Sequence, residues 1–282
     1  MSILEAVILG IVQGLAEFLP ISSSGHLVLL RNAFGISEPA MFFDIMVHIG
    51  TLLAVIVVLR QDVWAIMRRP FQPLTGYLIL ATIPVVIVAL FFTDLIDDAF
   101  ETGRFLGFSF LLTTVLLITA ELLSKRAQAK ASSAKPGLKD AESMTWLDAL
   151  IIGIMQAVAI SPGVSRSGAT ISAALSRKLN RDFAARFSFL LSIPVILGAL
   201  VLQVARMVRG TSAEAITAAE TAGGISAAAV IAGTVSAAVV GFFAVKFMLK
   251  IIRQRSLYGF AAYTAVLGIL VLIDQYITRI VF

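Results

Sequence analysis

Residues 10–26, GIVQGLAEFLPISSSGH, place a glutamine, a glutamate, three serines and a histidine inside an otherwise apolar chain. The part before Pro20 predicts a helix on which Gln13 and Glu17, four positions apart, share one face. Pro20 interrupts that helix, and the serines after it provide an N-cap for a second one. Small hydroxyl residues at a helix N-terminus leave backbone N–H groups open to an anion, and His26 can move a proton near neutral pH.

The composition of the whole chain is typical of an integral membrane protein. Hydrophobic residues make up 59% of its 282 residues, charged residues 14%, and the mean hydropathy is +0.97. An ionisable residue in such surroundings costs at least a few kcal/mol, so the polar stretch at 10–26 is by default a functional-site candidate. The chain has no cysteine, which excludes disulfides and thiolate chemistry.

The same stretch occurs a second time. At a constant offset of 143, residues 10–26 align without a gap to residues 153–169, GIMQAVAISPGVSRSGA. Seven of the 17 positions are identical: Gly10/Gly153, Ile11/Ile154, Gln13/Gln156, Ala16/Ala159, Ser22/Ser165, Ser24/Ser167 and Gly25/Gly168.

The differences between the two copies are complementary. Arg166 stands where the first copy has Ser23, and neither Glu17 nor His26 has a polar counterpart in the second copy. If the two loops meet, a carboxylate, a hydroxyl and an imidazole face a guanidinium that can bind phosphate through two parallel hydrogen bonds. That combination points to phosphoryl chemistry.

Both motifs resemble those of the bacterial undecaprenyl pyrophosphate phosphatases, also called the bacitracin-resistance family. Residues 12–26 are similar to that family's [EQ]-x-x-x-E stretch with its following Ser-Ser-x-Gly-His, and residues 161–170, SPGVSRSGAT, to its P-G-x-S-R-S-x-x-T loop. Motif order and chain length also fit, so the resemblance covers essentially the whole chain. It implies removal of the terminal phosphate from the C55 isoprenoid pyrophosphate, which regenerates the lipid carrier for peptidoglycan and confers bacitracin resistance.

The resemblance also assigns roles to individual residues. The expected catalytic residues are Glu17, Ser23, His26 and Arg166. The expected substrate-binding residues are Gln13, Ser22, Ser24, Gly25, Gly163, Ser165, Ser167 and Thr170. Gln13 takes the first position of the acidic motif, where some members have glutamate, so this chain has one carboxylate there. The family implies a divalent cation, Mg²⁺ or Ca²⁺, bridging Glu17 and the pyrophosphate, although the sequence has no metal-ligand cluster of His or Cys.

Two schemes remain open for the nucleophile. We favour Ser23, because it lies in mid-loop opposite Arg166 in the repeat alignment, with Glu17 as its base. His26 would then orient the hydroxyl or protonate the leaving lipid phosphate. In the competing scheme water attacks directly and Ser23 only binds phosphate.

The distribution of apolar and basic residues predicts the topology. Six apolar stretches are expected to span the membrane: 40–59, 75–93, 105–123, 187–205, 225–245 and 257–277. The motif segments 1–34 and 146–175 are expected to be re-entrant hairpins, because a crossing segment would place the basic turn after the second motif outside, against the positive-inside rule. Three spans per repeat invert the second copy, so the two loops meet near the midplane.

We therefore predict an all-α integral membrane protein of six transmembrane helices plus two re-entrant helical hairpins. It is a single membrane domain of two inverted repeats, 1–123 and 146–282, joined by a polar basic linker at 124–145. Both termini are expected outside a bacterial cytoplasmic membrane, and the resemblance implies a site that opens to the outer face. The expected partners are the polyprenyl pyrophosphate lipid, membrane lipids and a second copy in a homodimer; the net charge of +5 does not indicate nucleic acid.

His48 follows Asp44 by four positions on a predicted span, and we interpret the two as a helix-packing pair, with a role beside the site as the alternative. A polyprenyl-phosphate transporter or flippase is the rival function, favoured by the inverted repeat through analogy alone. A lipid phosphatase of the phosphatidic-acid-phosphatase type is excluded, because it needs a histidine after the Ser165–Arg166 pair and none follows.

Overall fold

The computed structural model describes residues 1–36, 41–92, 95–96, 99, 102–131, 138–209 and 225–282. Within these ranges the chain is helical, and the extended pairing is limited to an isolated bridge between Lys139 and Leu179. The long helices are α3 (Met41–Val58), α5 (Pro73–Phe91), α7 (Leu106–Ala131), α10 (Arg181–Arg209), α12 (Ala227–Gln254) and α13 (Tyr258–Ile273). The shorter ones are α4 (Arg60–Arg68) and the π-helical turn η1 (Asp274–Thr278).

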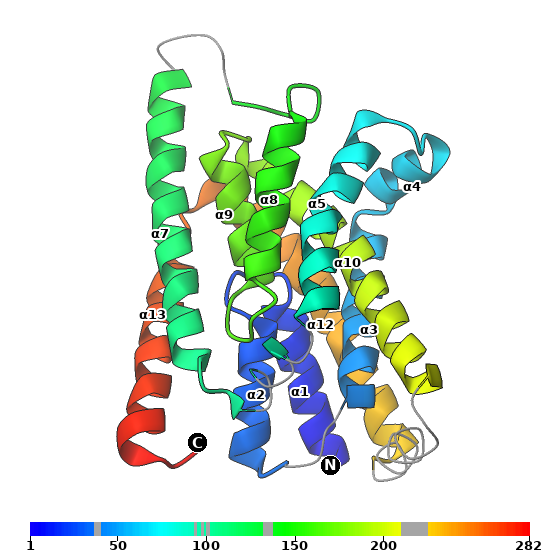
Figure 1. The fold of residues 1–282 in the computed structure, drawn as a ribbon, viewed down its shortest axis with the longest axis vertical. Helices are drawn as coiled ribbons and strands as arrows, with labels where there is room; N and C mark the ends of the chain where they lie inside the picture. The colour runs from blue at the N-terminus through cyan, green and yellow to red at the C-terminus, as the bar shows by residue number, and fades with distance from the viewer. Residues whose placement is uncertain (37–40, 93–94, 97–98, 100–101, 132–137, 210–224) are drawn as a thin grey trace.

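Two pairs of short helices contain the motif loops. The first pair is α1 (Ile3–Ala16) and α2 (Ser23–Phe34), and the second is α8 (Trp146–Val158) and α9 (Arg166–Ser176). The first pair lies toward the end of the molecule that holds both termini and the second pair toward the opposite end (Figure 1). The connecting loops of the two pairs come together in the middle of the molecule (Figure 1).

The length and composition of the helices indicate several membrane crossings. In the described ranges, α5, α7, α10, α12 and α13 are each long and apolar enough to span a bilayer. A sixth span results if α3 and α4 count as one crossing, although the two helices bend by 81° at their junction. The outer surface is apolar: on α5 the side chains of Ile79, Ile83, Val86 and Leu90 are 44–60% exposed. The chain is therefore a multi-pass membrane protein.

Helices occupy the described parts of all six stretches that were predicted to span, but three of them extend further than hydropathy indicates. α7 continues to Ala131, α12 continues to Gln254, and α10 runs from Arg181 to Arg209. In α7 the residues after the apolar part are mainly Ala and Lys, and in α12 Lys and Arg are interspersed with Phe, Met, Leu and Ile. Neither segment contains Gly or Pro, so nothing in it stops the helix. The first eight residues of the predicted linker at 124–145 are consequently helical.

The end of the molecule opposite the termini is held together by a buried carboxylate. Asp148, in the first turn of α8, is fully buried and accepts hydrogen bonds from Lys139 Nζ at 2.7 Å and Arg177 Nε at 2.8 Å. The backbone of Lys139 also accepts from Asn180 N at 2.7 Å. These contacts fasten the residues before α8 to the turn between α9 and α10.

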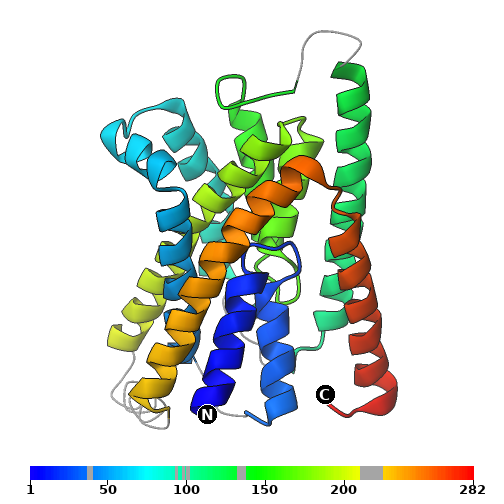
Figure 2. The ribbon, with the colours of Figure 1, turned by 180° about the vertical axis from the view of Figure 1, so that it is seen from behind.

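The two halves of the chain pack on each other through one repeated contact. α1 lies against α12 (Figure 2), and α8 lies against α5. A Cβ on Gly10 would collide with the carbonyl group of Gly233, and a Cβ on Gly153 with that of Ala81. Gly10 and Gly153 are the aligned glycines of the two motifs, so the same close approach of two helix backbones occurs in both halves.

Candidate active site

Two glycines allow the motif loops to touch. A Cβ on Gly25 would lie 3.0 Å from the Cα of Gly163 and 2.6 Å from the Phe110 ring. Gly163 itself has φ of +88°, a conformation that L side chains rarely adopt. The Ser167 hydroxyl donates to the Leu19 carbonyl at 3.0 Å, which joins the loops directly. The loops meet, as the repeat predicts.

Glu17 is the centre of the contact between the loops. Its side chain is only 6% exposed. Oε2 accepts hydrogen bonds from the Ser23 hydroxyl at 2.6 Å and from Gln13 Nε2 at 2.9 Å, and Oε1 accepts from Arg166 Nη2 at 3.0 Å. Three of the expected site residues therefore converge on one carboxylate, and Ser23 is bonded to the group that could take its proton.

Contacts from α10 hold Arg166 in place. Its Nη1 donates to the Ser188 carbonyl at 3.4 Å. The Thr170 hydroxyl donates to the Arg166 carbonyl at 2.9 Å and lies 2.6 Å from the Ser188 hydroxyl. Next to this group, Phe18 and Phe189 pack edge to face with ring centroids 5.5 Å apart. The guanidinium is consequently fixed on one side while facing Glu17 on the other.

The motif serines cap the two helices that begin at the site. The Ser22 and Ser165 hydroxyls accept from the backbone N–H three residues later, at 3.3 and 3.1 Å. The hydroxyls of Ser24 and Ser167 each lie 3.3 Å from the capping oxygen of their own loop. Two helix N-termini thus point to the loop contact, where their N–H groups and dipoles favour an anion.

His26 faces away from this cluster. Its Nδ1 lies 2.6 Å from the Ser22 carbonyl oxygen and its Nε2 lies 2.7 Å from the Tyr263 hydroxyl. The imidazole stacks on Tyr263 and meets Phe110 edge to face. These contacts direct the ring toward α7 and α13, whereas Glu17 and Ser23 bond to each other without it. The expected action of His26 on the Ser23 hydroxyl or the leaving group stays a prediction.

His48 lies beside the site. Its Nε2 is 3.8 Å from Glu17 Oε2, and its side chain is 33% exposed. His48 and Asp44 form the expected hydrogen-bonded pair, but through the backbone: His48 Nδ1 lies 2.7 Å from the Asp44 carbonyl oxygen. The Asp44 carboxylate pairs instead with Arg31 of α2. Since Asp44 is one turn back on the same helix, its carbonyl orients the imidazole toward Glu17.

Two further polar residues that support the site lie outside both motifs. The Thr113 hydroxyl of α7 accepts from Ser165 N at 3.0 Å and lies 3.3 Å from the Gly163 carbonyl oxygen. Ser188 of α10 contacts Arg166 and Thr170 as described above. Both side chains are fully buried in apolar helices. In the sequence, each of them can be recognised only as a polar residue within an apolar stretch.

The oxygen atoms that the site offers as metal ligands fit a cation that is held mainly by the substrate. The described residues contain no group of three or more His, Asp or Glu side chains arranged to hold a metal ion. Glu17 supplies one carboxylate, and Gln13 Oε1 is buried without a hydrogen-bond partner in the described part of the chain. One carboxylate and one amide oxygen match a hard cation that takes its other ligands from pyrophosphate and water.

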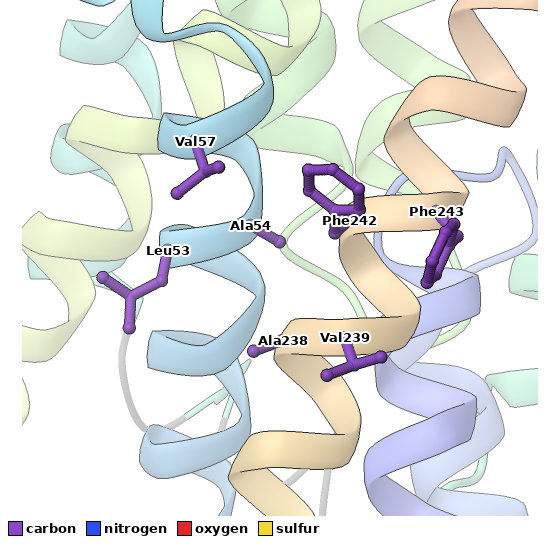
Figure 3. Close-up of a pocket in the computed structure, with 7 residues that line it drawn as sticks. All are labelled: Leu53, Ala54, Val57, Ala238, Val239, Phe242 and Phe243. Atoms are coloured by element: carbon purple, nitrogen blue, oxygen red, sulfur yellow. The ribbon is translucent and has the colours of Figure 1, made fainter.

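A separate pocket lies on the outer surface between α3 and α12 (Figure 3). It has a volume of about 270 Å³ and is lined by Leu53, Ala54, Val57, Ala238, Val239, Phe242 and Phe243. All of these side chains are apolar, so the pocket has no group that could bind or cleave a phosphate. The contact between the loops, and not this pocket, remains the candidate site.

Comparisons with known proteins agree with the geometry. A family model described as bacitracin resistance protein BacA matches residues 6–270. The chain is 43% identical over 275 residues to the undecaprenyl-diphosphatase of Carboxydothermus hydrogenoformans, with 98% of each chain covered. It is 45% identical over 276 residues to undecaprenyl-diphosphatase 3 of Bacillus cereus, again with 98% of each chain covered. It is 38% identical over 275 residues to the undecaprenyl-diphosphatase of Halothermothrix orenii, with 97% of this chain and 98% of the relative covered.

Proposed function

This chain belongs to the bacitracin resistance protein BacA family, and we propose on that basis that it hydrolyses undecaprenyl pyrophosphate to undecaprenyl phosphate and phosphate. It is a membrane-bound phosphatase that cleaves a phosphoric anhydride. The reaction returns the C55 lipid carrier to peptidoglycan synthesis and confers resistance to bacitracin. The observation that carries the proposal is the convergence of Ser23 and Arg166 on the carboxylate of Glu17.

The pyrophosphate is bound where α2 and α9 begin. Backbone N–H groups at the two helix N-termini, with the hydroxyls of Ser24 and Ser167, suit the phosphate oxygens. Arg166 provides two parallel N–H donors, which match the equatorial oxygens of the phosphoryl group during transfer. A divalent cation bound to Glu17 and Gln13 would neutralise part of the pyrophosphate charge.

The Ser23 hydroxyl attacks the terminal phosphorus in the scheme that we favour. Glu17 takes the hydroxyl proton, the oxygen forms a bond to phosphorus, and the bond between phosphorus and the bridging oxygen breaks. Undecaprenyl phosphate leaves with that electron pair, and water then hydrolyses the phosphoserine to release phosphate. The hydrogen bond of 2.6 Å from Ser23 to Glu17 supports this scheme, because it is the contact that a general base needs.

Direct attack by water is the competing scheme. Glu17 would then take a proton from water, while Ser23 would bind the terminal phosphate. The same hydrogen bond fits a serine that only positions the carboxylate. Kinetics of a Ser23 variant distinguish the two schemes.

Re-entrant hairpins and an inverted repeat are part of the proposal. The helix pairs α1–α2 and α8–α9 support it, because they approach from opposite ends and touch through their loops (Figure 1). The repeated contacts of Gly10 with Gly233 and of Gly153 with Ala81 support it as well. The capping boxes also recur, with Ser2 and Glu5 at the start of α1 and Thr145 and Asp148 at the start of α8.

The site is proposed to open to the outer face of a bacterial cytoplasmic membrane. Both termini lie at one end of the molecule, and α4 with its Arg60 and Arg68 lies at the other (Figures 1 and 2). The positive-inside rule favours a cytoplasmic position for the α4 end. His48 and the Arg31–Asp44 pair are on the segments of α2 and α3 that run from the loops toward the termini, which supports an opening on the outer side.

Phosphate release from a defined lipid tests the function. The purified protein in detergent should release phosphate from undecaprenyl pyrophosphate and leave undecaprenyl phosphate as the lipid product. A parallel reaction with chelator measures the contribution of the divalent cation. Absence of phosphate release from every polyprenyl pyrophosphate, with or without Mg²⁺ or Ca²⁺, would refute the proposal. A flippase without phosphatase activity would move the lipid and leave the pyrophosphate intact.

A further inference from the structure

The apolar pocket between α3 and α12 is open on the outer surface of the molecule. Four of its lining side chains, Leu53, Val57, Val239 and Phe243, are 48–63% exposed. Figure 3 shows the lining side chains on facing turns of the two helices. The volume of about 270 Å³ is below the range of about 300–1,000 Å³ that is typical of sites for whole drug-sized ligands. The pocket therefore fits a section of a single hydrocarbon chain.

Two cations lie just outside the lining of this pocket, toward α4. Lys246 of α12 places its Nζ 4.1 Å from the centroid of the Phe242 ring, and that ring lines the pocket. Arg60 follows the lining residue Val57 by three positions, where α3 ends and α4 begins. Both charged side chains are exposed. An apolar wall is thus combined with positive charge at one end.

No carboxylate in the described part of the chain neutralises these two cations. The acidic side chains of the neighbouring helix ends are already paired: Asp62 with Arg186, and Asp182 with Arg186 and Arg253. The charges at the end of the pocket are therefore available to an anion from outside the protein.

The two cations lie at the depth where phospholipid headgroups begin. α3 and α12 run in the same general direction, toward the end of the molecule that holds α4 (Figure 2). The apolar stretches that precede Arg60 and Lys246 are 41–59 and 227–245. Each is about 28 Å long at the helical rise, close to the thickness of about 30 Å of the hydrocarbon core. The pocket lies in the last turns of these stretches.

The direction of α4 supports the same depth. α4 bends by 81° from α3 and exposes the apolar side chains of Trp64 and Met67. The guanidinium carbon of Arg68 lies 5.0 Å from the centroid of the Trp64 ring. A short helix with exposed tryptophan and arginine, nearly perpendicular to a span, is typical of the membrane interface. Arg60, as its first residue, is then at the level of the headgroups.

The pocket is closed on the side of the motif loops. A Cβ on Gly241 would lie 3.2 Å from the Cβ of Ala54 and 3.5 Å from Phe18 Cε2. Phe18 is fully buried and directly follows Glu17. The chain of the substrate is tied to a pyrophosphate at the loops, so this wall separates it from the pocket.

We propose that the pocket binds an anionic phospholipid from the leaflet at the α4 end. A section of one acyl chain occupies the pocket, and the headgroup phosphate accepts hydrogen bonds from Arg60 and Lys246. An acyl chain matches the apolar lining, and an anionic headgroup matches the two unpaired cations. The inference goes beyond the phosphatase function, because this lipid is neither substrate nor product.

Native mass spectrometry tests the role of the charges. The purified protein in detergent is titrated with phosphatidylglycerol or with phosphatidylcholine of the same acyl chains. The wild type should bind its first phosphatidylglycerol at least about tenfold more tightly than phosphatidylcholine, and Arg60→Gln with Lys246→Gln should abolish that preference. Arg69→Gln with Arg126→Gln removes the same charge from other exposed positions and should retain it. Equal affinity of the wild type for the two lipids, or a preference that survives in the first double variant, would overturn the proposal.

A bulky side chain tests the position of the acyl chain. Ala238→Phe should fill the pocket and weaken phosphatidylglycerol binding by about tenfold, because less of the chain is then buried. Val235→Phe, at a 56% exposed position of α12 outside the pocket lining, should bind as the wild type does.

Other occupants of the pocket would give different results with Ala238→Phe. Unchanged phosphatidylglycerol binding would overturn the proposal. If only the KM for undecaprenyl pyrophosphate rises, the pocket holds the chain of the substrate. If a wild-type dimer dissociates in the variant while lipid binding stays the same, the pocket belongs to a second copy of the chain. A wild type that releases no phosphate would refute the phosphatase function and leave the lipid site untouched.

Discussion

Arg166 Nη2 donates a hydrogen bond of 3.0 Å to Glu17 Oε1, although the two residues are 149 positions apart in the chain. The cation of one loop therefore neutralises the base of the other before substrate is present. Both side chains are largely buried, at 14% and 6% exposure, so the pair is only weakly screened by water. We expect the pyrophosphate to compete with Glu17 for the guanidinium, which would free the carboxylate to act on Ser23.

Arg166→Lys should lower kcat by about 100-fold or more, because lysine cannot provide two parallel donors to the transferred phosphoryl group. The measurement is steady-state phosphate release from undecaprenyl pyrophosphate. Arg253→Lys is the matched control, since Arg253 is half exposed and pairs with Asp182 away from the loops. Turnover near the wild-type value in Arg166→Lys would contradict the assigned role.

Ser23→Ala should nearly abolish turnover if Ser23 is the nucleophile, and should mainly raise KM if the serine only binds phosphate. Ser176→Ala, at the far end of α9, is the control and should behave as the wild type. A Ser23→Ala enzyme that keeps a tenth or more of the wild-type kcat would exclude the covalent scheme and leave water as the attacking group.

Gly163→Ala should reduce both stability and turnover. The added Cβ would lie 2.7 Å from Ser109 Cβ, and the residue would be held at a positive φ. Such strain and overpacking each cost about 1–3 kcal/mol and would displace the loop that carries Arg166. Gly198→Ala is the control, because a Cβ there has no atom within 4 Å. Gly163→Ala should therefore have a lower melting temperature in detergent and release phosphate more slowly than Gly198→Ala. If the two variants behave alike, the loop tolerates the added Cβ.

Asp148→Asn should lower the free energy of unfolding by about 1–2 kcal/mol at neutral pH, because Lys139 and Arg177, which are partly exposed, lose the charge of their shared partner. Burial alone would raise the pKa of Asp148, but hydrogen bonds from Lys139, Arg177 and Thr145 lower it to about 2. A carboxyl with a lowered pKa stabilises the fold above its unfolded value of about 4 and loses that effect as the pH falls toward about 2.

The difference in melting temperature between wild type and Asp148→Asn should accordingly shrink over that acidic range. Glu142→Gln, on an exposed loop nearby, should melt as the wild type does at every pH. A difference that stays constant from neutral pH to about pH 2 would show that the charge of Asp148 is not the cause.

Single cysteines test the topology, since the chain contains none. A cysteine at Glu142 should react with a membrane-impermeant maleimide only after the cells are permeabilised. A cysteine at Ile280, which is 82% exposed near the C-terminus, should react in intact cells. The reverse pattern would place the termini in the cytoplasm.

Sequence reasoning found the parts of the site that are encoded locally. The repeat placed Ser23 opposite Arg166, and the structure brings both to Glu17. It offered a place beside the site for His48 only as the alternative, because hydropathy marks 40–59 as a span but leaves open which face of the helix meets α1. Tyr263 was missed for a similar reason: its contact with His26 joins residues 237 positions apart and depends on how α13 packs. The ends of α7 and α12 were misjudged because hydropathy reports contact with lipid, whereas helix propensity decides where a helix stops.

The contacts of Gly10 with Gly233 and of Gly153 with Ala81 have a consequence for the origin of the proposed inverted repeat. In each case the motif helix belongs to one half and the helix that receives it belongs to the other, so neither half contains its own partner. Two identical half-length chains, inserted upside down relative to each other, would satisfy both contacts. The proposed inverted repeat would follow from duplication and fusion of a gene for such a self-pairing half. After fusion the two loops could also diverge in sequence. The proposed site needs this divergence, because its base is in one copy and its arginine is in the other.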